Sequence, residues 1–227
     1  MKNIPNIITC LNLYAGCLSC IMSIKYDNYT GAFIFILLAA CFDFMDGFAA
    51  RLLKAYSPIG AQLDSLADVV SFGMAPGFMI YSFLLNVAQS FSLAVNLSFL
   101  AFLIPVFAAL RLAKFNVDSR QTTSFLGLPV PANALFWGGL IPSIPLSANN
   151  PVFWAFLIVT CIVIFCVLMV SELPMFSLKF THFGWVGNQY PYIMILIGLF
   201  LTVFFHLFGI SLAIVCYIIL SFVRHLK

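Results

Sequence analysis

The sequence has very little charge for its length. Charged residues make up 7% of the 227 positions, against about 25% in ordinary soluble domains. Hydrophobic residues make up 63%, and the mean hydropathy is +1.11. This balance excludes an ordinary soluble globular protein, and the ten Lys and Arg residues form no cluster dense enough to predict a nucleic-acid-binding surface. The chain is therefore interpreted as an integral membrane protein.

Metal-binding patterns built on histidine or cysteine are also missing. The three histidines, His182, His206 and His225, are scattered without the spacing of metal ligands. Cys17 and Cys20 have CxxC spacing, but no second ligand pair follows them. Neither residue type predicts a metal site.

Long apolar segments recur along the whole chain. A transmembrane helix needs roughly 17–25 residues. Helices are the expected form, because lipid offers backbone groups no partners and no ten-residue alternation indicates a barrel. Eight spans are expected, at Ile7–Ile24, Gly31–Leu53, Ala61–Ala88, Leu93–Ala113, Val130–Leu146, Val152–Val170, Tyr190–Phe205 and Leu207–Phe222. We expect an all-α polytopic membrane protein in which residues 1–227 form a single domain.

The first apolar segment, Ile7–Ile24, is expected to be a membrane helix and not a signal peptide. Lys2 is its only nearby charge, and the Cys17–Cys20 region is not a small-residue cleavage site. Asn6 and Thr9 are polar residues near its start, and they are expected to cap this helix rather than to reach a lipid phosphate.

The distribution of basic residues predicts the orientation in the membrane, because cytoplasmic loops collect Lys and Arg. With the N-terminus inside, Lys25 alone falls outside. The other nine basic residues fall on the cytoplasmic side: Lys2, Arg51, Lys54, Arg111, Lys114, Arg120, Lys179, Arg224 and Lys227. We therefore expect a multi-pass cell-membrane protein with both termini and the loop from Arg51 to Gly60 in the cytoplasm.

Four of the seven acidic residues fall in one short window. Asp43 and Asp46 are three positions apart, and Asp64 and Asp68 are four apart, so each pair shares one face of a helix. Ionisable groups at membrane depth cost at least about 2.5–3.5 kcal/mol each, and the window holds only two basic residues. Two helices that each offer two carboxylates can bind hard divalent cations. A capping or interfacial role for each aspartate is the alternative.

Small residues and one arginine accompany these carboxylates. Gly47, Ala50 and Gly60 lie beside them in the sequence and allow a ligand or another backbone to come close. Arg51 has a planar, permanently charged group that can grip a phosphate with two hydrogen bonds. It is also explained as an anchor that reaches the lipid headgroups. Beside four acids, the phosphate interpretation is favoured.

The spacing of these residues matches the signature of a known family. Written out, the window reads Asp43-x2-Asp46-Gly47-x2-Ala50-Arg51-x8-Gly60-x3-Asp64-x3-Asp68. The chain thereby resembles the CDP-alcohol phosphatidyltransferase family, whose pattern D-x2-D-G-x2-A-R-x8-G-x3-D-x3-D it matches at all eight fixed positions.

The resemblance implies a membrane enzyme that transfers a phosphatidyl group from CDP-diacylglycerol to an alcohol and releases CMP. It implies a six-helix core, here with two further C-terminal helices, and by analogy a homodimer. It implies two divalent cations, Mg²⁺ or Mn²⁺, held by four carboxylates, those of Asp43, Asp46, Asp64 and Asp68. The last of these, Asp68, would also be the catalytic base. The CDP-diacylglycerol would be bound by four further residues, Gly47, Ala50, Arg51 and Gly60.

The acceptor alcohol must be selected outside this motif. The stretch from Arg111 to Ala134, RLAKFNVDSRQTTSFLGLPVPANA, resembles the bacterial and archaeal branch of the family that uses L-serine and makes phosphatidylserine. The stretches PNIITCLNLYAG, DVVSFGMAPG and SELPMFSLK resemble the same branch. An amino acid needs a cation for its carboxylate and polar acceptors for its ammonium group, and Arg111, Lys114, Asn116, Asp118 and Arg120 offer both. Arg111 and Asn116 are the candidates for the acceptor, and Lys114 or Arg120 for the lipid phosphate. A solvated basic loop is the alternative for each.

Other functions remain open at this level. The same chemistry could serve glycerol 3-phosphate or an inositol phosphate as acceptor, or an archaeal-type lipid as donor. A cation transporter with an acidic site is a more distant alternative. Transporters usually show broken helices in two similar halves, whereas the four aspartates all lie in the first third of this chain.

Overall fold

The computed structural model is a bundle of helices and describes residues 3–88, 93–118, 125–145, 150–176, 184 and 188–225. Its helices are α1 (Ile4–Tyr26), α2 (Tyr29–Leu52), α3 (Pro58–Asp68), η1 (Val69–Met74), α4 (Ala75–Ala88), α5 (Leu93–Ser98), η2 (Phe99–Phe102), α6 (Leu103–Val117), α7 (Val130–Leu140), η3 (Ile141–Ser143), α8 (Pro151–Val170) and α9 (Gln189–His225). Two short strands, β1 (Phe125–Leu126) and β2 (Pro174–Met175), pair in antiparallel fashion. The expected all-α polytopic architecture is confirmed.

Within the described part of the chain, six helices are long enough and apolar enough to cross a membrane. They are Ile4–Tyr26, Tyr29–Leu52, Pro58–Val87, Asn96–Val117, Pro151–Val170 and Gln189–Arg224. The sequence predicts eight spans, and two features account for the difference. The span expected at Val130–Leu146 folds as the shorter α7 followed by η3. The last two expected spans are the two arms of α9.

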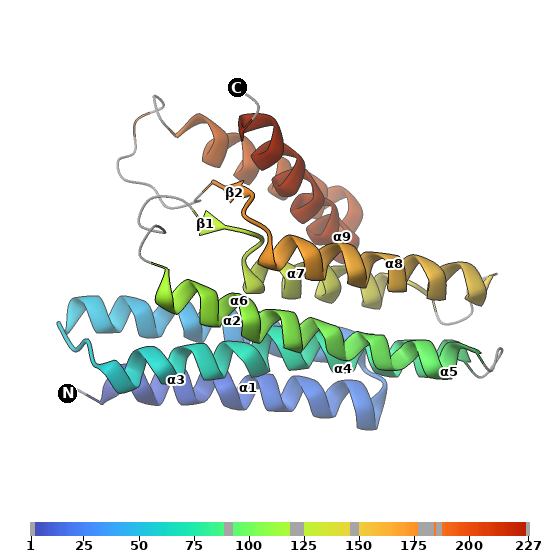
Figure 1. The fold of residues 1–227 in the computed structure, drawn as a ribbon, viewed down its shortest axis with the longest axis horizontal. Helices are drawn as coiled ribbons and strands as arrows, with labels where there is room; N and C mark the ends of the chain where they lie inside the picture. Colours follow the sequence, from blue (N-terminus) through green and yellow to red (C-terminus); the bar gives the residue numbers. More distant parts are fainter. Residues whose placement is uncertain are drawn as a thin grey trace.

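Helix α9 reverses direction at His206, which has non-helical angles of φ 52° and ψ −130°. A side chain at Gly209 would collide with the backbone carbonyl of Leu201, and a Cβ on Gly198 would lie 3.9 Å from the Cβ of Ala213. These contacts pair the two arms in antiparallel fashion, as the α9 ribbon in Figure 1 shows. The predicted break between Phe205 and Leu207 is therefore a tight turn with almost no loop.

The helices form a continuous series of contacts from α1 to α9. Helix α1 packs against α2, α3, η1 and α4, and α6 packs against η1 and α8. Helix α7 packs against α2 and α9, so that α9 covers the far side of the bundle (Figure 1). The start of α1 and the connection from α2 to α3 lie at the left end of Figure 1, and the end of α6 and the strand pair lie above them, on the left side of the picture. The candidate site lies toward this end.

The connection between α2 and α3 is short because both helix ends are well defined by their residues. Ser57 caps α3, accepting a hydrogen bond from the Gly60 amide at 3.0 Å, and Pro58 occupies the first turn, where its missing N–H costs nothing. Lys54 takes a left-handed conformation, φ 48°, just after α2 ends. This turn brings the acidic faces of the two helices opposite each other.

Directly after Asp68, the helix loosens into the π-helical segment η1, Val69–Met74. Such segments are rare and often occur at functional sites. Here α1 approaches closely, because a Cβ on Gly16 would lie only 2.7 Å from the Cα of Ser71. The Ser71 hydroxyl donates to the Asn12 carbonyl at 2.9 Å. Helix α1 is therefore locked against the residues that follow Asp68.

Candidate functional site

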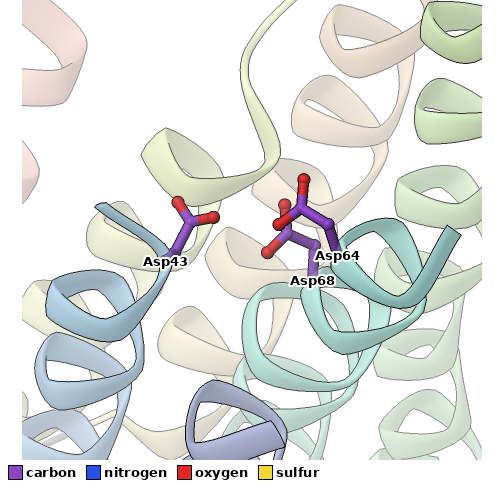
Figure 2. Close-up of side chains that lie close together, drawn as sticks. All are labelled: Asp43, Asp64 and Asp68. Atoms are coloured by element: carbon purple, nitrogen blue, oxygen red, sulfur yellow. The ribbon is translucent and has the colours of Figure 1, made fainter. Parts of the chain in front are cut away.

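Three of the four motif aspartates converge between α2 and α3. One carboxylate oxygen each from Asp43, Asp64 and Asp68 lies within 4.8 Å of the others. Figure 2 shows the Asp43 side chain reaching from α2 toward Asp64 and Asp68, which project from successive turns of α3. The spacing of four residues on α3 places both of its carboxylates on one face, as the sequence predicts.

Asp46 lies beside this cluster but points elsewhere. Its side chain is 6% exposed, and its Oδ2 accepts a hydrogen bond from the Thr9 hydroxyl at 2.6 Å. The Thr9 hydroxyl also lies 3.0 Å from the Pro5 carbonyl. The structure thus groups three carboxylates, while the expectation of four metal ligands stays a prediction for Asp46.

The cluster fits a hard divalent cation by its donor set. It offers carboxylate oxygens only, the ligands that Mg²⁺ and Mn²⁺ prefer. Asp64 Oδ1 is buried and has no hydrogen-bond partner among the described residues. A buried polar atom without a partner is costly. The two facing helices therefore present oxygens that a cation between them would satisfy.

A cavity of about 210 Å³ adjoins the carboxylates, and Asp46, Gly47, Ala50, Gly60 and Asp64 are among its lining residues. A Cβ on Gly47 would meet no atom within 4 Å, so this face of α2 is open. Three of the four residues predicted to bind the nucleotide thus line one cavity.

The fourth residue predicted to bind the nucleotide is Arg51. It lies in the last turn of α2 and is exposed. It therefore sits at the rim of the helix pair rather than in the wall of this cavity, and its role in binding the phosphates stays a prediction.

Helix α1 supplies contacts that sequence reasoning missed. The capping role expected for Asn6 and Thr9 is wrong, because α1 has Asn3 at its N-cap position without a side-chain cap. Asn6 lines the cavity, and its Oδ1 would lie 3.0 Å from a Cβ on Gly60. Thr9 contacts Asp46, as described above. Asn12 is fully buried, and its Nδ2 donates to Asp68 Oδ1 at 3.3 Å.

The signal for these contacts is present in the sequence. Asn6, Thr9 and Asn12 repeat every three residues in the mostly apolar first half of this helix. This spacing puts them on one face.

The residues predicted for the acceptor separate into two places. Arg111 and Lys114 line a second cavity, of about 340 Å³, between the ends of α6 and α8. Asn116 instead donates from Nδ2 to the Ser65 hydroxyl on α3, at 2.9 Å. Arg120 lies outside the described residues. The second cavity is also lined by Glu172, which the sequence analysis did not single out.

Arg111 connects the second cavity with the aspartate cluster. It is 7% exposed, and its guanidinium lies near enough to Asp68 for the two charges to interact. The same group lies over the ring of Phe115, 5.8 Å from its centre. The site as a whole therefore consists of the carboxylate cluster, a first cavity lined by Asp46 and Asp64, and a second cavity linked to the cluster by Arg111.

Comparison with known proteins agrees with this geometry. The family model of the CDP-alcohol phosphatidyltransferases matches residues 2–223. The chain is 36% identical over 183 residues to the CDP-diacylglycerol–serine O-phosphatidyltransferase of Bacillus subtilis, an alignment that covers 81% of this chain and 92% of that relative.

Two archaeal relatives align over a shorter part of the chain. The enzyme of the same name from Methanocaldococcus jannaschii is 35% identical over 136 residues, which is 60% of this chain and 59% of the relative. The archaetidylserine synthase of Methanothermobacter thermautotrophicus is 36% identical over 134 residues, 58% of this chain and 54% of the relative. With a family model that matches nearly its whole length and an aspartate cluster built by that family's motif, the chain belongs to the CDP-alcohol phosphatidyltransferase family.

Proposed function

We propose that this protein transfers the phosphatidyl group of CDP-diacylglycerol to the hydroxyl of L-serine, in a reaction that depends on divalent cations and yields phosphatidylserine and CMP. The convergence of Asp43, Asp64 and Asp68 beside a cavity lined by small motif residues carries the proposal. Serine as the acceptor is supported by the names of the relatives from Bacillus subtilis and Methanocaldococcus jannaschii.

The donor would occupy the cavity beside Asp46 and Asp64. Gly47 and Gly60 contribute no side chain there, so a nucleotide can approach the backbone of both helices. Arg51, at the rim, would pair with a phosphate. Mg²⁺ or Mn²⁺, two ions by family analogy, would supply neutralisation of the charge that develops on the pyrophosphate and the departing CMP.

Asp68 would act as the base. The serine hydroxyl would pass its proton to the Asp68 carboxylate, and the serine oxygen would bond to the β-phosphorus. The bond between this phosphorus and the oxygen of CMP would break, so that CMP leaves. A base must lie within hydrogen-bond reach of the proton that it takes. The Asn12 amide holds one oxygen of Asp68 at 3.3 Å and thereby restrains the carboxylate. Arg111 adds a positive charge nearby.

The alternatives differ in acceptor or donor. Glycerol 3-phosphate and inositol phosphates would require the same donor site. An archaeal-type lipid donor is supported by the name of the relative from Methanothermobacter thermautotrophicus. We further propose that the protein acts as a homodimer in the cell membrane, with both termini and the site on the cytoplasmic side.

The proposal can be tested with the purified protein, CDP-diacylglycerol, Mn²⁺ and labelled L-serine. We expect the label to enter the lipid fraction as CMP is released, both reactions to stop with a chelator, and both to return with Mn²⁺ or Mg²⁺. Asp68→Asn should abolish CMP release while the protein still elutes as a folded species. If serine stays water-soluble and glycerol 3-phosphate is converted, the proposed acceptor is wrong. If CMP release persists in Asp68→Asn, the proposed base is wrong.

A further inference from the structure

The second cavity, between the ends of α6 and α8, is lined by charges of both signs. Arg111 and Lys114 project from α6, Asp118 follows α6, and Glu172 lies two residues beyond α8. Only three acidic residues of the chain lie outside the motif, and two of them are here. The four formal charges cancel, so the cavity suits a ligand that carries both signs and no net charge.

Arg111 is the cationic group best prepared for a ligand. Its side chain is 7% exposed, it lines the cavity, and its Nε has no hydrogen-bond partner among the described residues. A desolvated guanidinium pairs strongly with a carboxylate. Lys114 is already engaged at the α8 end of the cavity, because its Nζ donates to the carbonyl of Val170, the last residue of α8, at 3.3 Å. A carboxylate in this cavity would therefore bind to Arg111.

The two acidic residues lie where a helix favours cations. Asp118 is the C-cap residue of α6, and Glu172 follows Ser171, the C-cap residue of α8. Helix C-termini carry partial negative charge, and free carbonyls there accept hydrogen bonds. Acidic side chains at the same place strengthen the negative potential. This end of the cavity would attract an ammonium group and repel a phosphate.

Resting on the function proposed above, we propose that this cavity is the acceptor subsite and that it selects a zwitterionic amino acid. Arg111 would bind the carboxylate, and Glu172 together with Asp118 would bind the ammonium group. Because Arg111 also lies beside Asp68, an amino acid held in this way directs its hydroxyl toward the carboxylate cluster. Anionic acceptors such as glycerol 3-phosphate would be disfavoured by the two acids.

The test is steady-state kinetics of Glu172→Gln and Asp118→Asn, which remove charge and keep shape. We expect each to raise the KM for serine about tenfold, since hydrogen bonds to charged groups are the strong ones. The KM for CDP-diacylglycerol should not change. The unmodified enzyme should use 3-hydroxypropionate, which lacks the ammonium group, far less well than serine. In Glu172→Gln the activities with serine and with 3-hydroxypropionate should lie closer together.

Asp27→Asn is the matched control. Asp27 is the remaining acidic residue outside the motif, lies in the turn between α1 and α2, and accepts hydrogen bonds from the neutral groups of Ser82 and Asn86. The KM of the Asp27→Asn variant for serine should equal that of the unmodified enzyme. If serine is turned over but both cavity variants keep the normal KM, the inference is wrong and the proposed function stands.

Two further outcomes keep the inference and the proposed function apart. If the unmodified enzyme uses 3-hydroxypropionate as well as it uses serine, the inference also fails, whether or not the variants fold. If the unmodified enzyme makes no phosphatidylserine but converts glycerol 3-phosphate, the proposed function itself fails.

Discussion

At the scale of single residues, the question is how each buried carboxylate is accommodated. Asp46 has the Thr9 hydroxyl at 2.6 Å, and Asp68 has the Asn12 amide at 3.3 Å. Asp64 Oδ1 has no partner among the described residues. The aspartates are thus not equivalent. Thr9 and Asn12 of α1 donate hydrogen bonds to Asp46 and Asp68, whereas Asp64 has a buried oxygen that could bind a cation.

Replacement of Thr9 by valine tests the first of these contacts. Thr9→Val keeps the shape of the side chain and removes the side-chain hydrogen-bond donor of the buried Asp46 carboxylate. Losing a hydrogen bond to a charged group costs about 1.5–3 kcal/mol. We expect kcat/KM for CDP-diacylglycerol to fall about tenfold or more, measured by CMP release.

Thr160→Val is the control for this substitution. Thr160 is on the exposed face of α8 and donates to the Phe156 carbonyl of its own helix. The Thr160→Val variant should release CMP at a near-normal rate. Equal activities of the two variants would show that the Thr9 contact does not support the donor site.

At the scale of elements, the site depends on how α1 crosses the α3–η1–α4 helix. The α2–α3 turn is local, because Ser57 and Pro58 define the start of α3, and it lies within the loop from Arg51 to Gly60 that the sequence predicts. The position of α1 against η1 is a long-range contact, made possible by Gly16 beneath Ser71. This crossing brings Thr9 and Asn12 to the aspartates.

Gly16→Ala should therefore be destabilising. The added Cβ would lie 2.7 Å from the Cα and 3.0 Å from the amide nitrogen of Ser71, so the backbones must separate. Overpacking of this kind costs about 1–3 kcal/mol, and we expect a Tm several degrees lower in detergent. Gly198→Ala, where the nearest atom is the Ala213 Cβ at 3.9 Å, should leave Tm unchanged or raise it. A Gly16→Ala protein as stable as the unmodified one would contradict the close approach.

At the scale of the whole molecule, the ends of the helices divide into two sets. The α2–α3 turn, which contains Lys54, lies at the end of the bundle where α1 starts, and the α1–α2 turn, which follows Lys25 in the last turn of α1, lies at the other end (Figure 1). Together with the excess of basic residues in the expected cytoplasmic loops, this arrangement favours a cytoplasmic site.

Labelling of engineered cysteines tests the orientation. In a cysteine-free background, Lys54→Cys should react with a membrane-impermeant maleimide only in inverted vesicles. Lys25→Cys should react in intact cells. Both lysines are exposed, so each serves as the control for the other. The reverse pattern would place the site outside the cell and overturn the proposed topology.

The sequence by itself determined the class of protein, most of the helix positions, the loop between α2 and α3 and the carboxylate faces, because hydropathy and helical period are properties of neighbouring residues. It overestimated one long span, since α7 is shorter than its apolar run, whereas the break that it predicts between Phe205 and Leu207 is the turn at His206. Only the tertiary structure decided that Thr9 donates to Asp46, that Asn12 donates to Asp68, and that Glu172 lines the same cavity as Arg111. The physical reason is that these contacts join helices far apart in the chain. They depend on how the apolar surfaces of those helices pack together, and the spacing of residues along the chain does not encode this packing.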